Sequence, residues 1–226
     1  MSQAFLKLIQ SGATAEVAAA VETDPSLAQA RDPQGVSPLL WSVYTGQELI
    51  RDYLITKLAS QGVDLDVFEA AAVGDDLRLR TILDGEPESA NSISGHGWTP
   101  LHLAAAFATP NAVELLLRHG ARVDAVSDNP QHNQPLHAAT ALSRNPEIVR
   151  LLLNNGAEVN ARQVGGFTPI FSAAAANQKD LVELLLAHGA DAHLKSDQGK
   201  TPAAFARDRG HADLAAWLEA LPLSLR

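Results

Sequence analysis

The 226-residue sequence predicts an all-α fold, a solenoid of stacked helix–turn–helix repeats. Three observations lead to this prediction. The chain contains 39 Ala and 32 Leu, two of the strongest helix formers. A Thr-Pro-Leu-His block recurs at intervals of 33 to 35 residues, and a Leu-rich block ending in Gly-Ala follows three of its copies. Because one helix pair cannot bury its apolar faces alone, the pairs are expected to stack and share a core.

The first block begins each repeat. Its clearest copy starts at Thr99 and reads Thr-Pro-Leu-His-Leu-Ala-Ala, and related copies start at Ser37, Gln134, Thr168 and Thr201. A Thr or Ser side chain caps the N terminus of a helix. Proline suits the first helical position, where its missing N–H would have had no partner. Each block therefore predicts the start of a first helix, and its two Ala residues allow neighbouring helices to approach closely.

The second block ends each repeat. It reads Val-Glu-Leu-Leu-Leu-Arg-His-Gly-Ala over Val113–Ala121, and related copies start at Val149 and Val182. The Leu triplet is expected to fill the layer between successive helix pairs. The glycine is expected to end the second helix in a left-handed conformation, which glycine adopts without steric cost.

Together the two blocks resemble the ankyrin repeat family, whose signature is this period and a Thr-Pro-Leu-His-x-Ala motif. The resemblance covers nearly the whole chain. Three segments, Asp66–Ala71, Gly97–Pro100 and Ala161–Gly166, also resemble a bacterial group of ankyrin proteins with no established activity. The resemblance implies short β-hairpin fingers between the helix pairs. It also implies that the fingers and first helices line a concave face, which in this family usually binds proteins.

On this basis the chain is expected to form one solenoid, residues 1–226. The expected units are an N-terminal capping helix pair at 1–33, repeat 1 at 34–64, a degenerate repeat 2 at 65–96, repeat 3 at 97–130, repeat 4 at 131–163, repeat 5 at 164–197 and a C-terminal capping repeat at 198–226.

The start of the degenerate repeat lacks Thr-Pro. Asp66 is predicted to cap the helix instead, and Glu69 three residues later would complete a capping box. Only 4 residues lead from Gly62 to Asp66, against 13 from Gly156 to Pro169. We therefore expect that no finger projects here, and that the preceding helix is longer by about one turn, ~3.6 residues.

The fourth repeat contains two insertions. The finger at 126–134 is enlarged, because Gly120 and Pro135 are 15 residues apart rather than 13, and the connection around 143–146 is one residue longer than in its neighbours. Surface loops tolerate insertions and often contain functional residues.

Composition excludes several classes of protein. With no Cys, the chain forms no disulfide, no thiolate zinc site and no cysteine nucleophile. The net charge of −9 argues against nonspecific nucleic-acid binding. No apolar run reaches the ~20 residues that span a bilayer, and the N terminus has no signal-peptide pattern. We expect a cytoplasmic monomer without a membrane segment.

The eight His residues suggest metal or acid–base chemistry, but most have a structural interpretation. The resemblance implies that His102 and His137 hydrogen-bond to the backbone. His96 and His132 would lie on successive fingers, roughly 10 Å apart, too far to share one zinc ion at about 2.0–2.1 Å per ligand. An enzyme that uses Asp128, His132 and His96 of the long finger remains the alternative function. The favoured interpretation is a protein with no catalytic residue, no metal and no cofactor.

Candidate binding residues follow from the variable positions that face the concave side in the family. Aromatic residues make up only 5% of the chain, and aromatic side chains dominate binding hot spots. The expected function is a noncatalytic protein-binding module, an adaptor, inhibitor or stabiliser of one partner. Alternatively, Trp98 and Phe167 only pack on the adjacent finger. Trp41, Phe205 and Trp217 are assigned to the core. The candidates are Val36, Tyr44, His96, Trp98, Phe107, Asn133, Leu142, Phe167 and Lys200.

Overall fold

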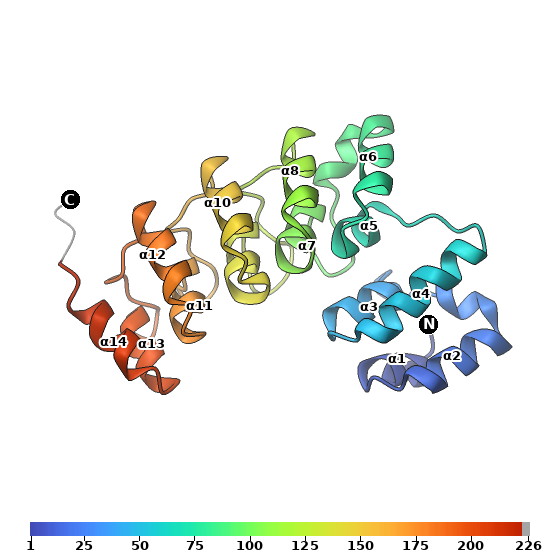
Figure 1. Cartoon of the computed structure of the whole chain (residues 1–226), viewed down its shortest axis with the longest axis horizontal. Helices are drawn as coiled ribbons and strands as arrows, with labels where there is room; N and C mark the ends of the chain where they lie inside the picture. Colours follow the sequence, from blue (N-terminus) through green and yellow to red (C-terminus); the bar gives the residue numbers. More distant parts are fainter. Residues whose placement is uncertain (223–226) are drawn as a thin grey trace.

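The computed structural model describes residues 1–222, which form an elongated stack of helix pairs (Figure 1). The last four residues of the expected C-terminal cap, 223–226, lie outside the described residues. The α-helices are α1 (Gln3–Gln10), α2 (Thr14–Thr23), α3 (Pro38–Tyr44), α4 (Glu48–Ser60), α5 (Val67–Val73), α6 (Asp76–Gly85), α7 (Pro100–Phe107), α8 (Pro110–Arg118), α9 (Pro135–Ala138), α10 (Pro146–Asn154), α11 (Pro169–Ala175), α12 (Lys179–Ala187), α13 (Pro202–Asp208) and α14 (Ala212–Glu219). Two 3-10 helices, η1 (Pro25–Gln29) and η2 (Pro87–Asn91), and a π-helix, η3 (Ala139–Ser143), complete the helical elements.

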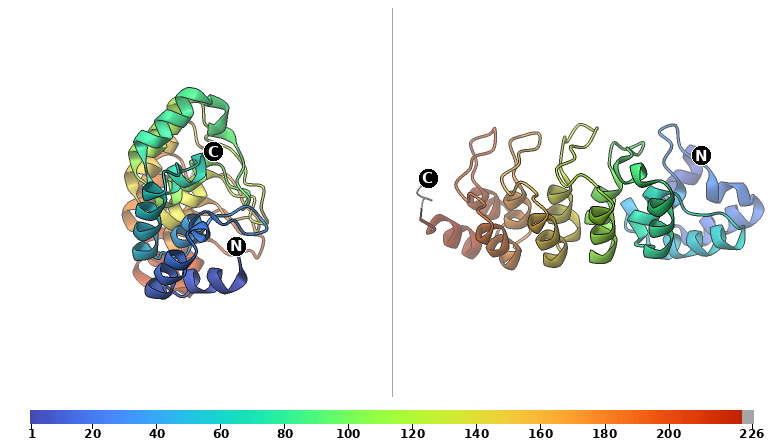
Figure 2. Two further views of the ribbon diagram at one scale, coloured as in Figure 1. Left: turned by 90° about the vertical axis from the view of Figure 1, so that its right-hand side faces the viewer. Right: turned by 90° about the horizontal axis from the view of Figure 1, so that it is seen from above.

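From α3 onward the odd-numbered helices form an inner row and the even-numbered helices an outer row (Figures 1 and 2). The Ala pairs and Leu triplets of the two blocks form the core between the rows. Ala104, Ala105 and Leu116 are all fully buried, as are their counterparts in the neighbouring repeats. The predicted all-α solenoid is confirmed.

The motif histidine joins each inner helix to the next finger. The Thr99 hydroxyl accepts the N–H of His102, and the His102 ring Nδ1 accepts the N–H of Thr99 at 3.3 Å, which makes a capping box. Since Nδ1 accepts, Nε2 carries the proton and donates to the carbonyl of Asn133 at 3.0 Å. His137 reaches the carbonyl of Ala161 in the same way. Both residues are structural, as predicted.

The fingers project to one side of the stack (Figure 2, right). Each is a hairpin turn closed by one backbone hydrogen bond, for example from Ser94 N–H to Trp98 O at 2.9 Å. The expected β-hairpins therefore exist as turns, because each finger is too short for a ladder, and residues 1–222 contain no assigned strand. The third finger closes from Ser127 to Asn133, two residues further apart than in the other fingers, which confirms its enlargement.

No finger projects between α4 and α5. Helix α4 has 13 residues, whereas the outer helices α8, α10 and α12 have 9 each, so the predicted extra turn is confirmed. Asp66 and Glu69 form the predicted capping box at the start of α5. Arg31 bridges from the first finger to Asp66 at 3.0 Å and to Glu69 at 3.4 Å. The stack changes direction at this junction (Figure 1).

The extra residue of the fourth repeat is absorbed in η3. An insertion in a helix produces a π turn, in which the hydrogen bond spans one residue more. Here the N–H of Arg144 donates to the carbonyl of Ala139 at 2.8 Å, and Arg144 adopts a left-handed conformation (φ 55°). The π turn leaves Leu142 49% exposed.

Candidate functional site: an aromatic cleft between the fingers

Aromatic rings from repeats 1 and 3 meet on the surface that the fingers and inner helices form, which we call the finger face. Tyr44 ends α3, Phe107 ends α7, and Trp98 closes the second finger. The ring centroid of Tyr44 lies 5.8 Å from that of Phe107 and 6.4 Å from that of Trp98. Helix α5 packs between α3 and α7.

His96 extends this group of rings at the second finger. Its imidazole lies 5.1 Å from the rings of both Trp41 and Tyr44. Trp98 stacks on the buried His102 at 5.9 Å. We call Tyr44, His96, Trp98 and Phe107 the aromatic cluster. Its members are half-buried, and Tyr44, Trp98 and Phe107 pack against the core.

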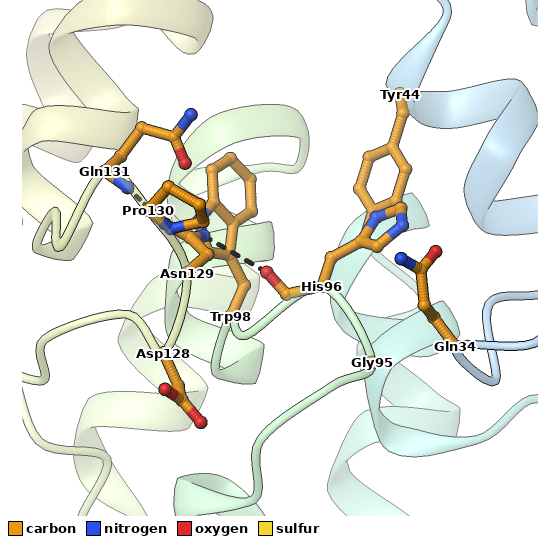
Figure 3. Close-up of a pocket in the computed structure, with 9 residues that line it drawn as sticks. All are labelled: Gln34, Tyr44, Gly95, His96, Trp98, Asp128, Asn129, Pro130 and Gln131. Atoms are coloured by element: carbon orange, nitrogen blue, oxygen red, sulfur yellow. Dashed lines mark hydrogen bonds between the residues drawn. The ribbon is translucent and has the colours of Figure 1, made fainter.

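A cleft of about 410 Å³ opens beside the aromatic cluster (Figure 3). In the figure the rings of Tyr44 and His96 stand on one side, and Trp98 stands on the other with Pro130. The cleft lies where the first three fingers come together. Its lining residues are Gln34, Tyr44, Gly95, His96, Trp98, Asp128, Asn129, Pro130 and Gln131.

Two hydrogen bonds to backbone carbonyls hold the enlarged third finger against the second. The N–H of Asp128 donates to the carbonyl of Gly97 at 2.7 Å. The side-chain amide of Asn129 donates to the carbonyl of His96 at 3.1 Å, and its oxygen accepts the N–H of Gln131 at 3.0 Å. The position of the third finger, and hence one side of the cleft, depends on these bonds.

Two polar atoms of the cleft are buried without a partner in the protein. These are the indole Nε1 of Trp98 and the hydroxyl of Tyr44. A buried polar group that lacks a hydrogen bond costs about 1–3 kcal/mol. Phenylalanine at either position would avoid this cost, so folding stability alone does not explain a Trp and a Tyr here.

The charges that act on the cleft are negative. Burial, followed by the nearby carboxylates of Asp66 and Asp32, raises the pKa of Tyr44 above its usual value. Burial lowers the pKa of His96, and the opposing effect of Asp32 is smaller, so this imidazole is neutral at pH 7. Asp32 itself accepts the indole N–H of Trp41 at 2.8 Å.

Six of the nine candidate residues do not line the cleft, and one of these, Phe107, stands beside it in the aromatic cluster. Val36 is 1% exposed, because it closes the first finger and packs into the core. Asn133 is 8% exposed, because its N–H donates to Ser127 Oγ and its carbonyl accepts from the His102 ring. Both side chains are therefore buried in this structure. Leu142 lines a separate cleft with Phe107 at the ends of the inner helices.

The remaining two candidates, Phe167 and Lys200, belong to a second ring group near the C terminus. The Phe167 ring lies 5.5 Å from Phe171 and 5.1 Å from Phe205. Lys200 binds Asp208 at 2.6 Å and lies 5.9 Å from the Phe205 ring centroid. Phe205, Trp41 and Trp217, assigned to the core from the sequence, are half-buried and packed against it.

The residues of the alternative enzyme are not gathered into one site. Asp128 and His96 line the cleft, whereas His132 is exposed and does not line it. Within residues 1–222, no three His, Cys, Asp or Glu side chains are close enough together to hold a metal ion. None of the helices in this range has the length and apolar character needed to cross a membrane.

Sequence reasoning missed several cleft residues, namely Gln34 and the run Asn129–Gln131. The enlarged third finger was the available signal for the second group. Its extra residues bring Pro130 and Gln131 beside Trp98 (Figure 3). Their side chains could not be placed from spacing alone, because the shape of a longer loop depends on its hydrogen bonds.

The stacked helix pairs, the motif histidines and the finger-lined face define an ankyrin-type solenoid. Family models for ankyrin repeats match residues 67–163 (three copies) and 152–206 (many copies). The chain is 30% identical to the probable 26S proteasome regulatory subunit p28 of Saccharomyces cerevisiae, over 69% of this chain and 71% of that protein. The chain therefore belongs to the ankyrin repeat family.

Other relatives are much longer proteins. The chain is 33% identical to the human neurogenic locus notch homolog protein 4 over 64% of its length, and 35% identical to the mouse ankyrin repeat and SAM domain-containing protein 6 over 46%. It spans only 6% and 11% of these two proteins. Ankyrin repeats are protein–protein interaction modules and are generally non-catalytic.

Proposed function

We propose that this chain is a noncatalytic adaptor, inhibitor or stabiliser that holds a protein partner on its finger face. The observation that supports this most strongly is the aromatic cluster. In a chain with 3 Trp, 2 Tyr and 6 Phe, one Trp, one Tyr and one Phe meet on this face beside an open cleft. Half-buried aromatic side chains in a pocket are the usual anchors of a protein interface.

The apolar surface continues beyond the cluster. Val164, on the next finger, is 55% exposed, and its N–H donates to the carbonyl of Gln131 at 3.0 Å. Leu142 is 49% exposed at the other end of the inner helices, beside Phe107. A partner seated on the finger face would therefore contact the central aromatic anchors and a surrounding apolar rim.

Affinity capture from a lysate of the organism that encodes the protein tests this proposal. The bait variants are a Trp98→Ala, Phe107→Ala double variant and a matched Leu49→Ala, Leu77→Ala control. Both control residues lie on outer helices, with exposures of 72% and 77%. Circular dichroism first establishes that all baits are folded. We expect the control to recover the wild-type partner and the aromatic variant to lose it. Equal recovery of every partner by all three baits would contradict the assignment of this face.

We also propose that the protein is a cytoplasmic monomer that works without a cofactor. The acidic net charge of −9 and the absence of Cys support an intracellular module that does not bind nucleic acid nonspecifically. Light scattering coupled to size exclusion would give about 24 kDa for a monomer, and about twice that mass would contradict it.

A further inference from the structure

The rings around the cleft have no cation of their own. In residues 1–222, a lysine ammonium lies over an aromatic ring at two places, Lys179 over Trp217 at 5.1 Å and Lys200 over Phe205 at 5.9 Å. Both pairs are at the C-terminal end of the stack. The aromatic cluster has no such pair, and neither Lys nor Arg is among the residues that line the cleft.

The carboxylates near these rings also lack basic partners. Asp128 lines the cleft with an exposed side chain, and Asp32 lies close enough to act on His96. Neither forms an ion pair with Lys or Arg in the part of the chain that the structure describes. Arg31, which precedes Asp32 in the chain, is held by Asp66 and Glu69. The cleft therefore combines half-buried aromatic rings with the exposed carboxylate of Asp128, which has no basic partner among residues 1–222. The nearby Asp32 carboxylate accepts neutral N–H donors, from the backbone of Gln34 and Val36 and from the Trp41 indole.

We propose that the cleft receives an arginine side chain of the partner protein, an inference that rests on the protein-binding function proposed above. A cation over an aromatic face is attracted by the ring quadrupole, and nearby carboxylates add to this attraction. The charge of the cleft therefore complements a basic side chain. The cleft volume of about 410 Å³ accommodates one long side chain.

Arginine fits the lining better than lysine does. Its planar guanidinium stacks on flat rings such as those of Trp98 and His96, and it is more weakly hydrated than an ammonium. Its N–H groups also require acceptors in several directions. The carboxylate of Asp128 and the amide oxygens of Gln34 and Gln131 are available at the edges of the cleft.

The test uses the full-length, ¹⁵N-labelled protein and three acetylated, amidated pentapeptides. Each has two glycines on either side of a central arginine, lysine or citrulline. Citrulline keeps the shape of arginine but has no charge. The protein has three Trp residues, and a Trp98→Phe variant identifies the indole N–H signal of Trp98.

We expect the arginine peptide to shift the Trp98 indole signal and the backbone signals of 128–131 in a saturable way. The citrulline peptide should bind roughly 2–30-fold more weakly, the range for an exposed to a desolvated cation over a ring. The lysine peptide should bind more weakly than the arginine peptide. Asp128→Asn, at an exposed position, should weaken the arginine peptide without changing the far-UV spectrum.

Equal binding of the arginine and citrulline peptides, or shifts confined to signals remote from the cleft, would overturn the proposal. Equal binding of arginine and lysine would overturn the preference for a guanidinium. This failure is distinguishable from failure of the proposed function. If lysate capture still depends on Trp98 and Phe107 while the arginine peptide does not bind, the protein-binding face stands and the arginine assignment falls.

Discussion

Replacement of Gly97 by alanine tests how the cleft is held open, because this residue joins the second finger to the third. Gly97 has a φ of +75° and its carbonyl accepts the N–H of Asp128 at 2.7 Å. A Cβ added to Gly97 would overlap the carbonyl oxygen of Asp128. Gly97→Ala therefore forces the third finger away from the second.

The expected loss has two parts. A left-handed conformation costs a residue with a Cβ about 1–2 kcal/mol. Displacement of the third finger also breaks two hydrogen bonds, from Asp128 to Gly97 and from Asn129 to His96, at about 0.5–1.5 kcal/mol each. We expect Gly97→Ala to lower the free energy of unfolding by roughly 2–5 kcal/mol.

Gly120 supplies the matched control. Its φ is +80°, but an added Cβ would have no atom within 4 Å, so Gly120→Ala should cost only the backbone part, about 1–2 kcal/mol. Urea unfolding followed by far-UV circular dichroism measures both variants at one pH and temperature. Equal losses in the two variants would refute the argument that contact between the fingers positions the cleft.

Three further predictions concern stability. Burial lowers the pKa of His102 from 6.5 to about 4, so the unfolded chain takes up a proton at this residue first as the pH falls. The free energy of unfolding of the wild type should therefore fall by about 3 kcal/mol between pH 6.5 and pH 4 because of this residue. Urea unfolding of His102→Gln should show a correspondingly shallower pH dependence. An unchanged pH dependence in the variant would count against this role. Asp66→Ala removes the α5 cap and should lower the free energy of unfolding by about 1 kcal/mol. Asp66→Asn keeps a hydrogen-bond acceptor and loses only an exposed ion pair, so it should lower the free energy of unfolding less. A larger loss for Asn than for Ala in the same assay would be inconsistent with capping. Deletion of residues 198–226 should lower the thermal midpoint and fray α11 and α12 without abolishing helicity, because repeats contact mainly their neighbours, and complete unfolding at room temperature would contradict this.

The sequence predicts the regular part of this fold because each repeat encodes its own local structure. Thr99 and Pro100 start a helix through a cap and a preset φ, and Asp66 with Glu69 starts another without the motif. Spacing alone also predicts the missing finger and the longer α4. These features depend on contacts within one or two turns of the chain, so one sequence is enough to predict them.

The finger face is less predictable because exposure there depends on contacts between repeats. Val36 and Trp98 occupy the same position in successive fingers, yet Val36 is buried in the core and Trp98 lies at the cleft. Asn133 occupies this position in the enlarged finger, where hydrogen bonds to Ser127 and His102 bury it. A repeat template assigns the position, but side-chain size and loop hydrogen bonds decide which way it faces.

Hydrogen–deuterium exchange of the protein, with and without a partner recovered by affinity capture, tests the central claim most directly. If the finger face holds the partner, peptides covering 94–98, 127–133 and the C-terminal half of α7 should exchange more slowly in the complex. Peptides of the outer helices α6 and α8 should exchange at their free rates. Slower exchange confined to the outer helices, with unchanged fingers, would contradict the claim that this protein binds its partner through the aromatic cleft.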